Sequence, residues 1–282
     1  MCCLSMNIQI FDFEVFKRDW VVVFKTLDAP EYFIYHNDPG AVQAHLEMHQ
    51  PMLGGFNIKG YDRHILKAVQ NDFSPEEVKQ VNDWIISGNN GWDYEPLRQL
   101  RGYNNLFDLM DDCQQGLSLK AIEAHLGMDI EESEVDFNLD RELTPEELEL
   151  TIRYCKFDVD ATEKLYHLRE NYLKSKIQVG AMVGIEPEKA MYMTNARLTA
   201  EFLGARPTTY TDERKYVYPE NLKREYIPQE VFDHFNIMYD STIPDEELFK
   251  TKTQIRIGDT EVTVGYGGVH AGIPNYQYKR KR

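Results

Sequence analysis

Two carboxylates lie two residues apart at the end of the first apolar segment of the chain. Asp12 and Glu14 flank Phe13 in the sequence Phe-Asp-Phe-Glu. Residues two apart on a β-strand point to the same face, so a strand here would bring both acids together and direct Phe13 into the core. Two negative charges this close are costly unless a cation lies between them. The pair indicates a cation site or, as the commoner alternative for an isolated Asp-x-Glu, two acids on a solvated strand face.

A third carboxylate, Asp62, ends the sequence Gly-Phe-Asn-Ile-Lys-Gly-Tyr-Asp, which follows a second short apolar segment. We expect Asp62 on the first turn of a helix, beside the end of a strand, where α/β sheets commonly gather ligands. An acid in a first turn is also stabilised by the helix dipole. Taken alone, Asp62 therefore does not distinguish a ligand from an ordinary helix-start residue.

The fourth carboxylate, Asp158, comes with a tyrosine on a predicted helix. Thr144 and Glu147 have the spacing of a capping box, and the helix that they begin can run through Tyr154 and Asp158 toward Leu173. Tyr154 and Asp158 are four residues apart and share one face. Asp160 lies on a different face. The alternative is a half-buried tyrosine next to an exposed aspartate.

As a set, these segments resemble a known family. Phe-Asp-Phe-Glu, Gly-Phe-Asn-Ile-Lys-Gly-Tyr-Asp and Tyr-Cys-Lys-Phe-Asp are similar, in order and spacing, to the three exonuclease motifs of the tyrosine-bearing DEDD 3′–5′ exonucleases. The similarity is greatest to the proofreading domain of family B DNA polymerases and covers about the first 180 residues. Arg153 stands where the sister subclass has histidine. The resemblance implies an α/β fold, with a ribonuclease H-like mixed sheet flanked by helices over residues 1–182.

The resemblance also implies a role for each site residue. Asp12, Glu14 and Asp158 would hold the catalytic metal ion, with Asp12 bridging to a second ion that Asp62 assists, and Tyr154 would orient the attacking water. Two Mg²⁺ or Mn²⁺ ions suit such a site, because hard divalent cations take oxygen ligands and paired ions serve phosphodiester hydrolysis. The expected reaction is release of nucleotides from single-stranded or frayed DNA 3′ ends.

Further residues are expected to contact DNA. Asn57 corresponds to the asparagine with which the family touches the single-stranded 3′ end, and Phe13 and Phe56 could stack on bases, although core packing is at least as good an interpretation for both. Leu106–Asp108 resembles an additional inner strand of the family, on which Asp108 could give polar support.

Residues 183–282 predict a smaller helical and hairpin extension with a polymerase-like character. Residues 193–200 resemble phage-type family B polymerases, and Tyr266, Gly267 and Gly268 resemble the Tyr-x-Gly-Gly motif with which protein-primed polymerases bind template. Glycines allow close approach of backbone to phosphate, but a glycine-rich turn after a hairpin is a serious alternative. The implied partners are primer-template DNA and a polymerase portion of the same or a companion chain. Neither Asp-x-x-Ser-Leu-Tyr-Pro-Ser nor Asp-Thr-Asp occurs, so we expect no nucleotide incorporation by this chain alone.

Composition limits the other function classes. The 282 residues carry a net charge of −16, concentrated in residues 1–182, which by itself argues against a nucleic-acid partner. Four cysteines without ligand spacing and no 18-residue apolar run predict a reduced, cytoplasmic protein with no membrane segment. His45 and His49 have metal-chelating spacing without an evident third ligand, and we interpret them as a solvated helix face. The open alternatives are a stand-alone RNA-processing exonuclease and a non-catalytic module that binds DNA and guides a primer.

The elements that must position these residues follow from periodicity and capping. The four site segments fall at strand ends, at helix starts or on one helix face. We expect strands over 7–16, 20–27, 32–35, 53–57 and 106–110, a hairpin over 254–264, a loop over 88–103, and helices over 41–49, 61–70, 74–86, 117–126, 144–173 and 188–202.

Overall fold

The computed structural model divides the chain into two compact units, Met1–Arg206 and Pro207–Arg282. It describes residues 6–113, 117–125, 127, 130–205, 223–237, 242–248, 250–257, 260–265 and 268–271.

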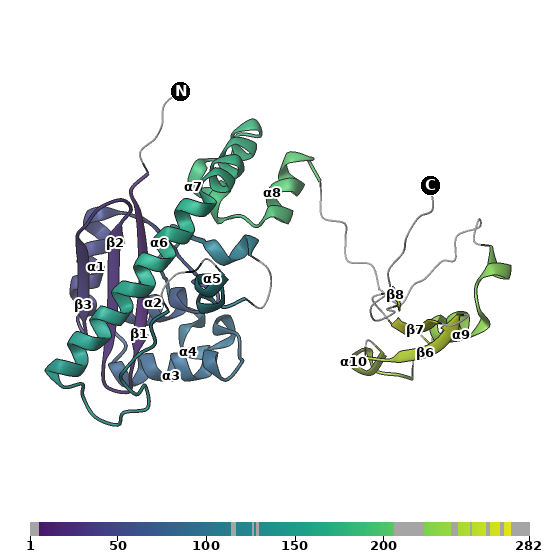
Figure 1. The fold of residues 1–282 in the computed structure, drawn as a ribbon, viewed down its shortest axis with the longest axis horizontal. Coiled ribbons are helices and arrows are strands. Elements are labelled where there is room, and N and C mark those ends of the chain that lie inside the picture. Colours follow the sequence, from purple (N-terminus) through teal and green to yellow (C-terminus); the bar gives the residue numbers. More distant parts are fainter. Residues whose placement is uncertain are drawn as a thin grey trace. The chain divides into compact units, whose positions relative to one another are not determined.

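The first unit is built on a five-stranded mixed sheet in the order β3-β2-β1-β4-β5. Figure 1 labels three of its strands, β1, β2 and β3. β1 pairs antiparallel with β2 and parallel with β4, β2 pairs antiparallel with β3, and β4 pairs parallel with β5. The strands are β1 (Ile8–Val15), β2 (Trp20–Thr26), β3 (Tyr32–His36), β4 (Met52–Gly55) and β5 (Leu106–Asp108). With helices on both faces, this is the expected ribonuclease H-like α/β fold.

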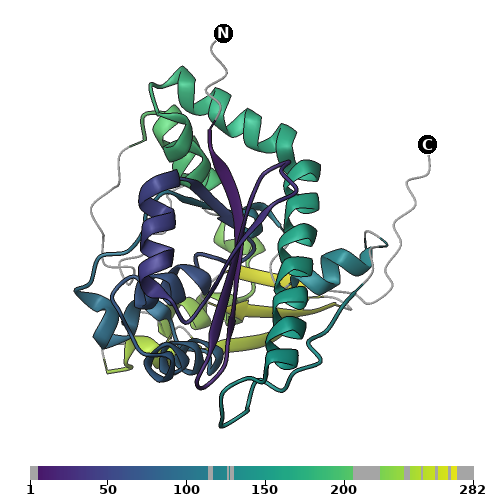
Figure 2. The same cartoon turned by 90° about the vertical axis from the view of Figure 1, so that its left-hand side faces the viewer.

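The helices of the first unit cover both faces of the sheet. In Figure 2, the purple helix α1 and the long teal helix α6 lie on opposite sides of the strands. The helices are α1 (Pro39–His49), α2 (Asp62–Val69), α3 (Pro75–Ile86), α4 (Glu95–Arg98), α5 (Leu119–His125), α6 (Pro145–Met182), α7 (Pro187–Tyr192) and α8 (Asn195–Phe202). Short 3-10 turns span Gly91–Asp93 and Leu109–Asp112.

Side chains along β1 alternate between two apolar cores. Phe11 and Phe13 pack with residues of α1, α2 and α3 on one face. Ile8 and Ile10 pack with residues of α6 on the other face. Asp12 lies on the same face of β1 as Ile10, because residues two apart on a strand share a face. The acids of β1 therefore share one face, as the sequence predicted, and that face is the one packed against α6.

Helix α6 is the longest element and begins at the predicted capping box. The Thr144 hydroxyl accepts a hydrogen bond from the Glu147 backbone N–H, the Glu147 carboxylate accepts one from the Thr144 N–H, and Pro145 occupies the first helical position. The helix continues to Met182, nine residues beyond the expected Leu173. Its 38 residues correspond to a rod of about 57 Å.

Several local expectations need correction. The segment 188–202 is two helices, since Thr194 begins α8 as an N-cap, and the expected loop 88–103 contains α4 and a 3-10 turn. The interpretation of His45 as solvated was wrong: it is 3% exposed. Its Nε2 is hydrogen bonded to Gln9 Oε1 at 2.7 Å, so a polar partner on β1 satisfies a histidine that sequence periodicity places on the surface.

The second unit contains a three-stranded antiparallel sheet, and pairing of β6 with β7 confirms the predicted hairpin. Val231, Ile255, Val262 and Val264 form its core. Of the Tyr-x-Gly-Gly residues, Tyr266 and Gly267 lie outside the described residues, whereas Gly268 opens β8. The elements are a 3-10 turn (Arg224–Tyr226), α9 (Gln229–Ile237), α10 (Asp245–Leu248), β6 (Lys252–Ile257), β7 (Thr260–Gly265) and β8 (Gly268–Ala271). None of the helices in the described ranges is sufficiently long and apolar to span a lipid bilayer.

Candidate active site

Strand β1 presents the first two acids of the candidate site. Asp12 is partly buried and Glu14 is 6% exposed. Phe13, between them, is 4% exposed and packs against the rings of Phe11 and Trp20 with centroids 6.2 Å away in each case. A ring packed in this way has little free surface for stacking on a base.

The turn between β4 and α2 brings in Asp62 and Asn57. Asp62 is the first residue of α2, is 2% exposed, and its Oδ1 has no hydrogen-bond partner in the described part of the chain. Asn57 has a φ of 62°, in the left-handed region that asparagine tolerates. A Cβ at Gly60 would lie 2.6 Å from Asn57 Oδ1, so glycine is required at that position for the side chain to lie where it does.

Asp108, at the end of β5, holds this turn in place. One of its carboxylate oxygens accepts the backbone N–H groups of Asn57 and Met110, both at 2.9 Å, and the other accepts the N–H of Lys59 at 2.8 Å. Asp108 is 6% exposed. It gives the polar support that the sequence suggested, by binding backbone N–H groups of the turn that carries Asn57.

Helix α6 contributes Tyr154 and Asp158 one turn apart. The carboxylate Oδ1 of Asp158 accepts a hydrogen bond from Lys120 Nζ at 2.8 Å, and the same ammonium lies 4.8 Å from the centroid of the Tyr154 ring. Asp160 faces elsewhere: it is paired with Lys25 Nζ at 2.7 Å and accepts the Tyr32 hydroxyl. The structure therefore separates Asp160 from the site, as its position on the helix predicted.

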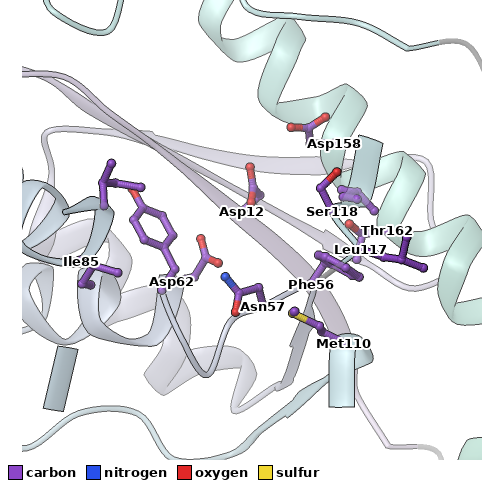
Figure 3. Close-up of a pocket in the computed structure, with 13 residues that line it drawn as sticks. Asp12, Phe56, Asn57, Asp62, Ile85, Met110, Leu117, Ser118, Asp158 and Thr162 are labelled. Atoms are coloured by element: carbon purple, nitrogen blue, oxygen red, sulfur yellow. The ribbon is translucent and has the colours of Figure 1, made fainter. Parts of the chain in front are cut away.

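The four predicted carboxylates line two adjoining pockets. One, of about 650 Å³, is lined by Asp12, Asp62 and Asp158 together with Asn57 and Phe56 (Figure 3). The other, of about 460 Å³, is lined by Glu14 and Tyr154 and shares Asp12 and Asp158 with the first.

The surroundings of these four carboxyl groups strongly disfavour their ionised forms. Burial, followed by the charges of Asp62, Glu14 and Asp158, raises the pKa of Asp12 well above its usual range. Burial and then the Asp158 charge raise the pKa of Glu14, and burial raises that of Asp62 to about 8. Burial also raises the pKa of Asp158, although Lys120 opposes the shift. Such shifts mark groups that need a cation to ionise at neutral pH.

Sequence reasoning missed two residues of α5 at this site. Lys120 is the only Lys or Arg between Arg101 and Arg141, and an isolated cation in so acidic a stretch was a usable indication. Glu123 is 1% exposed, its Oε2 lies 3.8 Å from Lys120 Nζ, and no hydrogen bond reaches either carboxylate oxygen from the described residues.

The donor set fits divalent hard cations. The Oδ1 of Asp62 is buried without a partner, and ligand atoms of Asp12, Glu14 and Cys155 lie within 4.8 Å of one another. Carboxylates are the ligands that Mg²⁺ and Mn²⁺ prefer, whereas a thiol suits softer metals. Cys155 is fully buried, with its Sγ 3.4 Å from the backbone oxygen of Asp12, and burial raises the pKa of this thiol. We therefore assign Cys155 to packing beneath Asp12.

Two solved family B DNA polymerases have parts similar to this chain. The enzyme from the hyperthermophilic archaeon Pyrobaculum calidifontis aligns with a TM-score of 0.43 and 15% identity over 71% of this chain and 29% of its own. Phi29 DNA polymerase, complexed with primer-template DNA, aligns with a TM-score of 0.39 and 15% identity over 64% of this chain and 35% of its own. No protein-family model and no curated protein sequence matches. At this level of similarity, the function has to be inferred from the site residues.

Proposed function

We propose that the chain is a metal-dependent 3′–5′ exonuclease that releases nucleotides from single-stranded or frayed DNA ends, as the proofreading part of a family B-like DNA polymerase. The observation that carries the proposal is the convergence of Asp12, Glu14, Asp62 and Asp158, from β1, α2 and α6, on two adjoining pockets. Among the described residues, Lys120 is the cation that opposes the raised pKa values of Asp12, Glu14 and Asp158. A cluster with so little compensating charge is suited to bind divalent cations.

Asp12, Glu14, Asp62 and Asp158 would hold two Mg²⁺ or Mn²⁺ ions. When bound, such ions supply an activated water nucleophile and stabilise charge on the leaving oxygen of a phosphodiester. Tyr154 contributes a phenol whose pKa is raised, first by burial and then by the charge of Asp158, so that it keeps its proton and can donate to a water at the reacting phosphate. The acids neutralise cations, and the phenol orients the nucleophile.

The same pocket offers contacts to a strand end. Asn57 and Phe56 line it beside Asp12 and Asp62, and Phe56 is partly buried, with part of its ring available to a base. An amide and an aromatic ring are suited to hold a terminal nucleotide by hydrogen bonding and stacking. The position of these two residues in the pocket, where they are able to hold a single-stranded end, supports the choice of a frayed 3′ end as substrate.

The proposed division of labour places exonuclease chemistry in residues 1–182 and polymerase-like contacts to primer-template DNA in residues 183–282. The proposal also includes a polymerase portion, in the same or a companion chain, that supplies the strand end. The aligned region covers 29% and 35% of the two similar polymerases.

The proposal is tested with a 5′-labelled DNA oligonucleotide incubated with Mg²⁺ or Mn²⁺, with and without EDTA. We expect shortening from the 3′ end that EDTA stops and that Asp12→Ala/Glu14→Ala abolishes. A matched control is Glu31→Ala/Glu149→Ala, which removes two exposed acids away from the pockets and leaves the rate unchanged. Hydrolysis retained in the Asp12/Glu14 variant would refute the site assignment.

Two other outcomes lead to different functions. Faster digestion of a matched RNA oligonucleotide would indicate an RNA-processing exonuclease. Binding of DNA without cleavage in Mn²⁺ would indicate a non-catalytic module that guides a primer.

A further inference from the structure

A separate pocket of about 470 Å³ lies where α2, α4, the 3-10 turn Gly91–Asp93 and the segment 100–104 meet. Its lining is cationic, which is unexpected on a chain with a net charge of −16. The charged and aromatic lining residues are Arg63, Lys67, Arg98, Arg101, His64 and Trp92.

The cations of this pocket have no acidic partner in the part of the chain that the structure describes. Within the described ranges, Lys67, Arg98 and Arg101 form no ion pair. The acids nearest in sequence to Lys67, Asp62 and Asp72, and those that precede Arg98, Asp93 and Glu95, do not line the pocket. Burial, followed by the Arg63 charge, lowers the pKa of Lys67. Four like charges held around one hollow repel each other, and an anionic ligand would relieve that repulsion.

Polar and aromatic groups complete the pocket. His64 is 2% exposed, and its Nε2 has no hydrogen-bond partner among the described residues. Its ring packs closely against Gly91, where an added Cβ would come within 2.5 Å of the imidazole. The indole of Trp92 is 49% exposed, stands edge-on to His64 with centroids 5.0 Å apart, and carries the Arg63 guanidinium 4.1 Å above its face. An exposed ring among guanidinium and ammonium groups matches the way single-stranded nucleic acids are bound.

Helix α2 connects this pocket with the acidic site. Asp62 is its first residue, and Lys67, five residues later, lies about 8 Å further along the helix axis. A DNA strand whose 3′ end enters the acidic site needs to extend only a few nucleotides to reach the cations of the basic pocket.

We propose that this basic pocket binds phosphate groups of the same DNA single strand whose 3′ end occupies the acidic site. The assignment of the strand rests on the proposed exonuclease function. A free nucleoside monophosphate could bind through the same chemistry, with its phosphate at the cations and its base beside the aromatic ring. The experiments therefore compare a DNA strand with a nucleoside monophosphate.

Binding is measured first, independently of cleavage, by fluorescence anisotropy of a 5′-fluorescein-labelled twelve-nucleotide oligothymidylate, in EDTA and in Ca²⁺. Loss of two phosphate contacts in Lys67→Gln/Arg101→Gln should reduce the slope of log K against log salt by about 1.4 and weaken binding roughly tenfold. The matched control Lys174→Gln/Arg141→Gln removes one lysine on α6 and one arginine just before α6, both exposed and ion-paired, and should bind like the unaltered chain. Equal slopes and affinities in all three proteins, or no binding by the unaltered chain in either condition, would overturn the proposal.

Trp92 reports which ligand occupies the pocket. The oligonucleotide should quench indole fluorescence, Trp92→Phe should remove that change, and thymidine monophosphate should not reproduce it. Equal quenching by the monophosphate would overturn the assignment to a strand.

Hydrolysis gives the final comparison. Lys67→Gln/Arg101→Gln should raise KM for the twelve-nucleotide substrate with kcat unchanged, and leave KM for a dinucleotide unaltered. An equal rise in KM for both substrates would contradict the proposal. If no protein hydrolyses either substrate, the exonuclease function fails, and the binding measurements still decide whether the pocket binds a strand.

Discussion

Lys120 gives the acids of the site unequal environments. Its ammonium bonds to Asp158 and lies over Tyr154, whereas Asp62 has a carboxylate oxygen with no partner among the described residues. Among the four acids, Asp158 thus has a direct counter-charge, while the pKa of Asp62 is raised to about 8 by burial. The two carboxylates therefore differ in how strongly they need a bound cation.

Tyr154→Phe should lower kcat while metal binding is retained. The raised pKa of Tyr154 keeps its hydroxyl protonated at neutral pH, and removal of one oriented donor at a reacting centre costs about 10²-fold or more. The rate is measured on a 5′-labelled oligonucleotide, and Mn²⁺ affinity by calorimetry. Tyr226→Phe, at a tyrosine 76% exposed in the second unit, is the control. An unchanged kcat in Tyr154→Phe would remove the tyrosine from the catalytic machinery.

At the scale of elements, the two glycines that end β4 allow it to pack closely against β5 and against the turn that follows β4. A Cβ at Gly54 would come within 2.3 Å of the Phe107 ring, and one at Gly55 would come within 2.3 Å of Ile58 Cγ2. The strand positions the turn that carries Asn57 and Asp62. The positions of Asn57 and Asp62 in the site therefore depend on the close packing of β4 against Phe107 and Ile58.

Gly54→Ala should destabilise the protein by about 1–3 kcal/mol, because the added methyl group overpacks the buried β4–β5 contact. Chemical denaturation measures the change in the free energy of unfolding. Gly40→Ala is the matched control: it lies in the first turn of α1, where the nearest atom to an added Cβ is 3.5 Å away, and should be neutral or slightly stabilising. Equal stability of both variants with the unaltered chain would show that β4 can shift to make room.

Local rules predicted most elements, and the reasons for the exceptions are physical. Alternation predicted β1 and the common face of Asp12 and Glu14, and the Thr144 capping box predicted the start of α6. An isolated cation in an acidic stretch singles out Lys120, but its partner Asp158, like the partner Gln9 of His45, lies far along the chain, and no local pattern reveals either pairing. The basic pocket was missed for the same reason, because its cations come from separate segments that only folding brings together.

For the whole molecule, the buried carboxyl groups of the site lower the stability of the fold more strongly as pH rises and they lose their protons. Asp62 has a folded-state pKa of about 8 against an ordinary value of 3.8, so the folded protein binds this proton more tightly than the unfolded chain does. The stability that this proton contributes is complete below about pH 4 and is lost as pH rises through about 8. Asp12 and Glu14, whose pKa values are also raised, act in the same direction.

Divalent cations should therefore stabilise the protein more at pH 8 than at pH 5.5, because protons compete with metal for the same carboxylates. The measurement is Tm in Mn²⁺ minus Tm in EDTA at each pH. In Asp12→Ala/Glu14→Ala the difference should shrink at both values. A larger metal-induced increase at pH 5.5 than at pH 8 would contradict this account of the charge.

The length of α6 sets how a tilt of the helix would move the site. Asp158 lies about 20 Å from its capped start and Met182 about 56 Å from it, at 1.5 Å per residue. A tilt of the rigid rod about its start that moves the far end by about 3 Å would displace Asp158 by about 1 Å, and misalignment of this size can change a reaction rate about 10²-fold. Helices α7 and α8 pack against α6 in the first unit. A displacement of α6 imposed through them would therefore be smaller at Asp158 than at the far end, on the ångström scale that decides catalytic alignment.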